Sequence, residues 1–245
     1  MNAWATAVLD LLYPALCPVC DHALGAGRRD PLCRECWNAI ERIDPPFCAT
    51  CGLPWPAFEP AASTLPLRCH ACVTAAPPFD YGRAAGAYAG PLREALHALK
   101  FGGKRALAGP LSVLVLEQCG AVLGPHVDAL VPVPLARARE RERGFNQAAL
   151  LAAHLAAASG LPSRPAWLSR ARGTRPQTEL TAGERRTNVS RAFVASPGVS
   201  GAHVVLVDDI VTTGATAAEC GRTLRAAGAR AVGVLAVARV LAVTL

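Results

Sequence analysis

The sequence of 245 residues lacks the patterns of several broad protein classes. Its 21 glycines and 20 prolines follow no triplet period, which excludes a collagen-like chain. No repeat of about 20–50 residues is visible, so a solenoid is not expected. The first 17 residues have no basic segment, and Asp10 interrupts their apolar run, so neither a signal peptide nor a membrane span fits them. We therefore expect an amphipathic helix there and a cytoplasmic location.

Charged residues are also scarce, at 18%, whereas hydrophobic residues make up 52%, so a disordered chain is not expected. The formal net charge is +7, and residues 137–191 account for all of it, with eleven Arg, four Glu and no Lys or Asp. This local charge indicates an anionic partner, with a solvated arginine-rich surface as the alternative. Aromatic residues are only 5% and are not interleaved with these arginines, so no base-stacking surface is evident.

Cysteine, by contrast, is abundant, and eight of the ten cysteines form four CxxC pairs between residues 17 and 72. One CxxC turn presents two thiolates to one ion, and two such turns complete a tetrahedral zinc site. The pattern predicts two structural Zn²⁺ ions, with redox dithiols as the alternative. The spacing suits pairing in chain order but leaves crossed pairing open. The predicted ligands are Cys17, Cys20, Cys33, Cys36, Cys48, Cys51, Cys69 and Cys72.

The other metal-binding residue types have simpler interpretations. His70 lies inside a CxxC turn but is expected to be a bystander, because four thiolates are available for each ion. Cys119 and Cys220 lie in apolar stretches and are interpreted as buried free thiols. The cysteine pairs stop before Pro77 and Pro78, which divides the chain into a zinc-ribbon domain, residues 1–76, and a second domain, residues 77–245.

The second domain alternates predicted helices and strands, which is typical of an α/β fold with a mainly parallel sheet flanked by helices. The apolar periodicity predicts strands over residues 127–133, 203–207 and 231–237. It predicts helices over residues 90–100, 104–123, 145–159 and 215–227, and a capping box at residues 181–184 indicates a further short helix.

The segment VVLVDDIVTTGAT, residues 204–216, combines a strand, two carboxylates and a Thr/Gly turn that enters a helix. Ligands bind at the carboxyl ends of strands in open α/β sheets, and the N–H groups that begin a helix bind anions. Gly214 permits an unusual backbone conformation, and the threonines supply hydroxyl donors. The turn has no Lys, so it is not a P-loop. This arrangement predicts a sugar phosphate ligand.

The run VVLVDDIVTTGAT resembles the phosphoribosyl pyrophosphate (PRPP) signature of type I phosphoribosyltransferases, and the whole chain is similar to the ComF family, whose members join a double zinc ribbon to a phosphoribosyltransferase-like domain. The resemblance covers nearly the whole chain. Its other motifs are the four CxxC pairs, residues 99–102 (LKFG), 131–134 (VPVP) and 143–147 (RGFNQ), Gln177 and residues 185–189.

The resemblance implies a role for each matching residue. Asp208 and Asp209 would bind the ribose hydroxyls, and Mg²⁺ would be held mainly by pyrophosphate and water. Lys100 and Lys104 are interpreted as solvated residues at a helix end, with a ligand contact as the alternative. The 5′-phosphate would contact Val211, Thr212, Thr213, Gly214, Ala215 and Thr216. The leaving pyrophosphate would contact Arg137, Arg139 and Arg143, and a flexible loop would contribute Gln177 and Arg185.

The resemblance therefore implies a Mg²⁺-dependent phosphoribosyltransferase that binds PRPP or a related phosphoribose ligand and is associated with DNA uptake and natural transformation. Its acceptor is not identified. The acceptor would lie under a hood formed by the zinc region and residues 79–88, and no cysteine follows Met1 to suggest a glutaminase nucleophile. The alternative is a non-catalytic component of the competence machinery that binds single-stranded DNA. A competence helicase or ATPase is the implied protein partner.

Overall fold

The computed structural model describes residues 15–24, 31–55, 66–171 and 192–241. The expected N-terminal helix, the capping box at residues 181–184, Gln177 and Arg185 lie outside these described residues.

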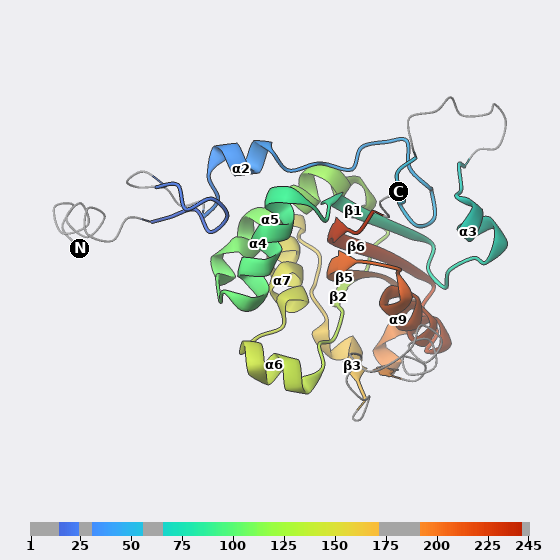
Figure 1. The fold of residues 1–245 in the computed structure, drawn as a ribbon. Helices are drawn as coiled ribbons and strands as arrows, with labels where there is room; N and C mark the ends of the chain where they lie inside the picture. Colours follow the sequence, from blue (N-terminus) through green and yellow to red (C-terminus); the bar gives the residue numbers. More distant parts are fainter. Residues whose placement is uncertain (1–14, 25–30, 56–65, 172–191, 242–245) are drawn as a thin grey trace, which may run out of the picture.

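A four-stranded sheet forms the centre of the second domain (Figure 1). Its strands are all parallel, as predicted, and their order is β1-β6-β5-β2. The strand predicted at residues 127–133 is shorter in the structure. The strand predicted at residues 203–207 continues for four more residues, because it stays paired with its neighbour up to Val211. The strands are β1 (Tyr81–Ala87), β2 (Ala129–Pro132), β5 (His203–Val211) and β6 (Ala231–Arg239).

Strand β1 corrects one expectation, since residues 79–88 were assigned to a hood outside the core. The strand sequence YGRAAGA has few large apolar side chains, so its periodicity is weak. The small residues are required by packing. A Cβ added at Gly86 would lie 2.7 Å from Leu92 Cδ2 and 2.8 Å from the carbonyl oxygen of Glu41. The sequence of this edge strand alone therefore does not indicate a strand, whereas its packing against neighbouring segments does.

Helices cover both faces of the sheet (Figure 1). Three lie on one face and α9 lies on the other, and each face has its own cluster of buried Leu, Val and Ala side chains. The predicted helix over residues 104–123 is divided into a 3-10 turn, α5 and a second 3-10 turn; Pro110 lies in the first turn of α5, where it removes no hydrogen bond. The helices are α4 (Gly90–Phe101), α5 (Ala108–Cys119), α7 (Gln147–Ser159) and α9 (Ala215–Ala226).

Several short elements were not predicted. Helix α6 (Arg137–Arg143) is the charged sequence RARERER, which has no apolar period, and it ends at Gly144 with φ 75°. Strands β3 (Leu168–Arg170) and β4 (Phe193–Ala195) form an antiparallel pair outside the main sheet. Each of these elements is too short for periodicity to reveal it.

The described parts of the zinc region form two units that lie apart in Figure 1. We call them ribbon 1, residues 15–40, which contains α2 (Arg34–Asn38), and ribbon 2, residues 47–74, which contains α3 (His70–Thr74). Ribbon 2 docks directly on β1. The N–H of Gly82 donates to the carbonyl of Thr50 at 2.6 Å, and a Cβ added at Gly52 would lie 2.4 Å from the carbonyl oxygen of Gly82.

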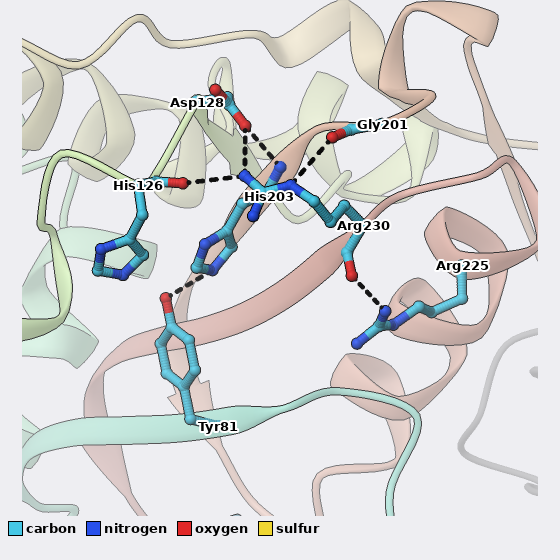
Figure 2. Close-up of polar contacts among 7 residues, drawn as sticks. All are labelled: Tyr81, His126, Asp128, Gly201, His203, Arg225 and Arg230. Atoms are coloured by element: carbon cyan, nitrogen blue, oxygen red, sulfur yellow. Dashed lines mark hydrogen bonds and ion pairs between the residues drawn. The ribbon is translucent and has the colours of Figure 1, made fainter.

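A polar cluster lies at the amino ends of the strands (Figure 2). Nε2 of the buried His203 lies 3.1 Å from the hydroxyl of Tyr81, and the His203 N–H donates to Asp128 Oδ2 at 2.7 Å. The rings of His126 and His203 stack with centroids 5.1 Å apart. Burial, followed by the charges of His126 and Arg230, lowers the pKa of His203, and burial raises the pKa of Tyr81 to about 12. The cluster therefore favours a neutral His203.

Within the described residues, the longest and most apolar helices still fall short of what a bilayer crossing requires.

Candidate functional site

The eight predicted zinc ligands form two clusters, in each of which the sulfur atoms lie within 4.8 Å of one another. Pairing follows chain order: ribbon 1 contributes Cys17, Cys20, Cys33 and Cys36, and ribbon 2 contributes Cys48, Cys51, Cys69 and Cys72. The Sγ atoms of Cys20 and Cys33 are 3.6 Å apart, and those of Cys51 and Cys69 are 3.7 Å apart. Two thiolates at about 2.3 Å from one tetrahedral Zn²⁺ would be about 3.8 Å apart. Both clusters are therefore consistent with structural zinc.

Backbone N–H groups prepare the thiolates for a cation. The N–H of Cys69 donates to Cys48 Sγ at 3.2 Å, and the N–H of Cys33 donates to Cys17 Sγ at 3.5 Å. Burial opposes ionisation, but these N–H groups outweigh it and lower the pKa of Cys17 to about 7 and that of Cys48 to about 6.

The remaining cysteines and His70 are not part of the clusters, as expected. Cys119 and Cys220 are buried, and burial raises the pKa of Cys119 to about 12. Such thiols are weak nucleophiles. His70 is exposed, and its Nε2 lies 3.4 Å from the hydroxyl of Thr74.

Asp208 and Asp209 lie near the carboxyl end of β5 and point to opposite faces of the sheet. Side chains alternate along a strand. Val205 and Val207 belong to the core beneath α4, α5 and α7, so Asp209 lies on that side, whereas Asp208 lies on the side of α9. Burial and the neighbouring Asp209 charge raise the pKa of Asp208 well above its usual range.

Asp209 is buried and engaged at both carboxylate oxygens. Its Oδ2 forms an ion pair with the Lys100 ammonium group at the end of α4, and its Oδ1 accepts from Gln147 Nε2 at 3.4 Å at the start of α7. Arg143 Nη1 in turn donates to Gln147 Oε1 at 3.1 Å. The interpretation of Lys100 as solvated is therefore wrong, because its side chain is only 15% exposed; Lys104 is exposed, as expected.

The Thr/Gly turn follows β5 directly and leads into α9, as predicted. Gly214 has φ 79° and is the N-cap residue of α9. No side chain at this N-cap position forms a hydrogen bond to the first turn of the helix. The hydroxyl of Thr213 accepts from the N–H of Ala215 at 3.4 Å, and both residues are exposed. The first N–H groups of a helix have no partner within it, so this turn presents donors to solvent at the carboxyl edge of the sheet.

The three candidate arginines of α6 occupy two environments. Arg143 is half-buried and belongs to the Asp209 network, whereas Arg137 and Arg139 are exposed. Arg137 lines a cavity of about 260 Å³ together with Asn146 and Arg170. Burial, and then the positive charge of Arg139, lowers the pKa of Arg170. The structure therefore brings one of the three predicted arginines to the acidic pair and places two near Arg170.

Tertiary structure also pairs aromatic rings with arginines, which sequence reasoning missed. Arg143 lies 4.8 Å from the centroid of the Phe101 ring, and Arg105 lies 4.6 Å from that of Phe145. The Phe101 side chain is 62% exposed and follows Lys100 directly. The motifs LKFG and RGFNQ contain the two aromatic rings of these contacts, but neither motif indicates which arginine its ring would contact. Aromatic residues that are not interleaved with the arginines in the sequence thus lie beside them in space.

The acidic pair offers oxygen ligands suitable for Mg²⁺, but few of them. Asp209 is already engaged by Lys100 and Gln147, and within the described residues the only clusters of three or more His, Cys, Asp or Glu ligands are the two cysteine clusters. The donor set fits a Mg²⁺ ion that receives most of its ligands from a bound diphosphate and water.

Comparison with known proteins agrees with this arrangement. Residues 8–73 match the double zinc ribbon domain family, and residues 141–244 match the phosphoribosyl transferase domain family. The chain is 36% identical over 235 residues to DNA utilization protein YhgH of Escherichia coli (strain K12), covering 94% of this chain and all of that protein. It is 30% identical to competence protein F of Haemophilus influenzae, covering 86% and 91%, and 27% identical to competence protein ComFC of Bacillus subtilis, covering 78% of each.

Proposed function

The chain belongs to the ComF/YhgH family, and from this premise we propose that it is a Mg²⁺-dependent type I phosphoribosyltransferase that binds PRPP at the carboxyl end of β5. The observation that carries the proposal is the acidic pair followed at once by the exposed, donor-rich turn before α9. A sugar phosphate presents hydroxyl groups and a phosphate at the spacing of one ribose ring. The association with DNA uptake rests on the names of the relatives.

In this proposal the two carboxylates have different tasks. Asp208, which forms no ion pair among the described residues, binds the ribose hydroxyls. Asp209 is held by Gln147 and by Lys100, which balances its charge, so it fixes the carboxyl end of β5 beneath the ribose. The turn from Thr212 to Thr216 holds the 5′-phosphate through backbone N–H groups and hydroxyls.

The leaving group lies on the side of β2 and α6. Arg143 is linked to Asp209 through Gln147, and Arg137 and Arg139 extend the positive surface; guanidinium groups bind phosphate oxygens in pairs. Mg²⁺ bound to the pyrophosphate would neutralise part of its charge as the C1–O bond breaks. Gln177 and Arg185 remain proposed contacts of this ligand.

Isothermal titration calorimetry with PRPP and Mg²⁺ tests the site. We expect binding by the wild type and its loss in Asp208→Asn/Asp209→Asn, with zinc content unchanged. Lys100→Met should weaken PRPP binding at least tenfold, whereas Lys104→Met, an exposed lysine four residues away, should not. Unchanged affinity in the double Asp variant would overturn the sugar site. A pyrophosphate-release assay with a panel of bases and amines then tests catalysis.

A second function, binding of single-stranded DNA, is favoured by the exposed Phe101 ring beneath Arg143. Aromatic rings stack with unpaired bases, and arginines bind the backbone phosphates. Phe101→Ala should weaken oligo(dT) binding about tenfold. Affinity that does not fall with salt, or that is equal in Phe101→Ala, would contradict this function.

A further inference from the structure

Gln147, the first residue of α7, is one of the few buried polar side chains in the described part of the chain, with 6% of its surface exposed. Its amide lies between two groups of opposite charge. Nε2 donates to Asp209 Oδ1 at 3.4 Å, and Oε1 accepts from Arg143 Nη1 at 3.1 Å. A carboxylate only accepts hydrogen bonds and a guanidinium only donates them, so this orientation of the amide satisfies both neighbours and the reverse orientation satisfies neither.

The short linker between α6 and α7 is held at both of its ends. Gly144 ends α6 with φ 75°, and its carbonyl accepts from Arg105 Nη2 at 3.1 Å. The side chain of Asn146 caps α7, and its Nδ2 also donates to the carbonyl of Val133, directly after β2, at 3.1 Å. The last residue of α6 and the first residue of α7 are therefore held in a fixed relation to each other and to the end of β2.

The charges of this network do not cancel. Lys100 forms an ion pair with Asp209, and Gln147 carries no charge, so the positive charge of Arg143 stays uncompensated. Among the described residues, Arg143 forms one hydrogen bond and no ion pair. Its guanidinium lies over the Phe101 ring, 4.8 Å from the centroid, and a contact with the ring face leaves the in-plane N–H donors unused.

The neutrality of the Gln147 amide matters for an anionic ligand. A carboxylate at this position would hold Arg143 more strongly, but it would compensate the charge of the guanidinium and compete with the ligand for its N–H groups. It would also place a second negative charge beside Asp209. The amide instead holds the guanidinium in place and leaves its charge available to a diphosphate.

We propose that Gln147 is a positioning residue for pyrophosphate, whose neutral amide fixes Arg143 against Asp209 so that the remaining N–H groups of Arg143 bind the diphosphate of PRPP. The inference rests on the proposed PRPP site. Gln147 acts through Arg143 rather than through a contact of its own with the ligand. Loss of its amide should therefore affect the diphosphate part of the ligand and spare the ribose phosphate part, which is assigned to Asp208 and the Thr/Gly turn.

Calorimetry with the two halves of PRPP, inorganic pyrophosphate with Mg²⁺ and ribose 5-phosphate, tests this role. Gln147→Glu keeps the size of the side chain but compensates the charge of Arg143, so pyrophosphate should bind about tenfold more weakly or worse. The affinity for ribose 5-phosphate should be unchanged. Gln118→Glu is the matched control, because it makes the same change of charge on α5, at a residue that no hydrogen bond links to this network among the described residues. It should leave both affinities unchanged.

Gln147→Met gives a second test if Gln147→Glu misfolds, because it removes both hydrogen bonds without adding a charge. It should weaken pyrophosphate binding about threefold, as expected for the loss of a hydrogen bond. In an Arg143→Met background neither substitution at Gln147 should weaken pyrophosphate binding further, because the effect passes through Arg143.

The outcomes separate this role from a purely structural one. A loss of pyrophosphate affinity that disappears in the Arg143→Met background, with ribose 5-phosphate binding retained, supports the positioning role. Equal losses for both ligands would overturn it, because they would mean that Gln147 only maintains the fold. Unchanged pyrophosphate affinity in both Gln147 variants, or no pyrophosphate binding by a wild type that binds PRPP, would overturn it as well. Absence of PRPP binding in the wild type would instead overturn the proposed function.

Discussion

The two zinc ribbons and the central sheet bury different kinds of side chain. Five of the eight cluster cysteines are buried in the ribbons, together with a few aliphatic residues such as Leu24 and Ile40. The sheet and its helices bury long, contiguous sets of Leu and Val, among them the fully buried Leu206 and Val205. The difference teaches that the first region has a small apolar core beside two cysteine clusters suited to metal, whereas removal of apolar surface from water stabilises the second.

The largest expected effect is the loss of metal from ribbon 2. Cys48→Ser/Cys51→Ser should bind one zinc ion per chain rather than two, and residues 48–55 and 66–72 should lose protection in hydrogen exchange while the sheet keeps it. Structural zinc contributes about 10–16 kcal/mol in isolated zinc-finger peptides, more than so small a core can replace. Cys119→Ser, a buried cysteine outside both clusters, should keep two zinc ions. Two ions in the double variant would refute the ligand assignment.

A smaller effect should follow from a cavity in the sheet. Leu206→Ala removes a fully buried side chain of β5 and should lower the free energy of unfolding by about 2–5 kcal/mol in urea titrations. Zinc content should stay at two ions per chain, because the ribbons do not depend on this core for their ligands. Val194→Ala, at a side chain that is 56% exposed, should change stability by no more than about 0.5 kcal/mol. Loss of zinc in Leu206→Ala would show that the two regions fold as one unit.

The contact between ribbon 2 and the central sheet can be weakened without changing a buried side chain of either region. Gly52→Ala adds a Cβ that meets the Gly82 carbonyl at 2.4 Å, at a φ of 70°, and should cost about 1–3 kcal/mol of stability. Gly160→Ala is the matched control, because its φ is 74° but no atom lies within 4 Å of the added Cβ. The first variant should be less stable than the second and should exchange the Gly82 amide proton faster. Equal stability would mean that the contact between ribbon 2 and β1 does not exclude a side chain at residue 52.

The smallest effect concerns pH. The folded protein binds a proton at His203 less readily than the unfolded chain, whose His has a pKa of about 6.5. Stability from this residue is therefore complete above that value and falls as the pH decreases towards the lower pKa of the folded state. His203→Gln should reduce the slope of unfolding free energy against pH between 7.5 and 6, measured by urea titration with zinc content checked. A slope equal to that of the wild type would exclude His203 as the titrating group.

Sequence reasoning found what short spacing or periodicity specifies. The eight ligands, β5 and β6, and the helices α4, α7 and α9 were predicted with small errors at their ends. It missed β1, whose small residues give little periodicity; at Gly86 the small size is set by the close approach of Leu92 and Glu41, residues of other segments. It missed α6, because a run of charges has no apolar face to detect.

The candidate site also has one part that the sequence identified and one part that only the structure revealed. The acidic pair and the Thr/Gly turn adjoin in the chain, so a single strand-turn-helix unit presents them, and the sequence alone identified them. The pairing of Asp209 with Lys100 and Gln147 is absent from any local pattern. These residues come from the end of α4 and the start of α7, which meet only where both helices pack on one face of the sheet.

The sequence by itself determined the number and identity of the clustered cysteines, the parallel α/β architecture and the position of the Thr/Gly turn that leads into α9, because these depend on residues a few positions apart. Only the tertiary structure decided which CxxC turns share a cluster. It also decided that Lys100 forms an ion pair with Asp209 and that a cavity lies between ribbon 2 and α9. The physical reason is that contacts between distant segments depend on which faces become buried together, and sequence separation carries no information about that choice.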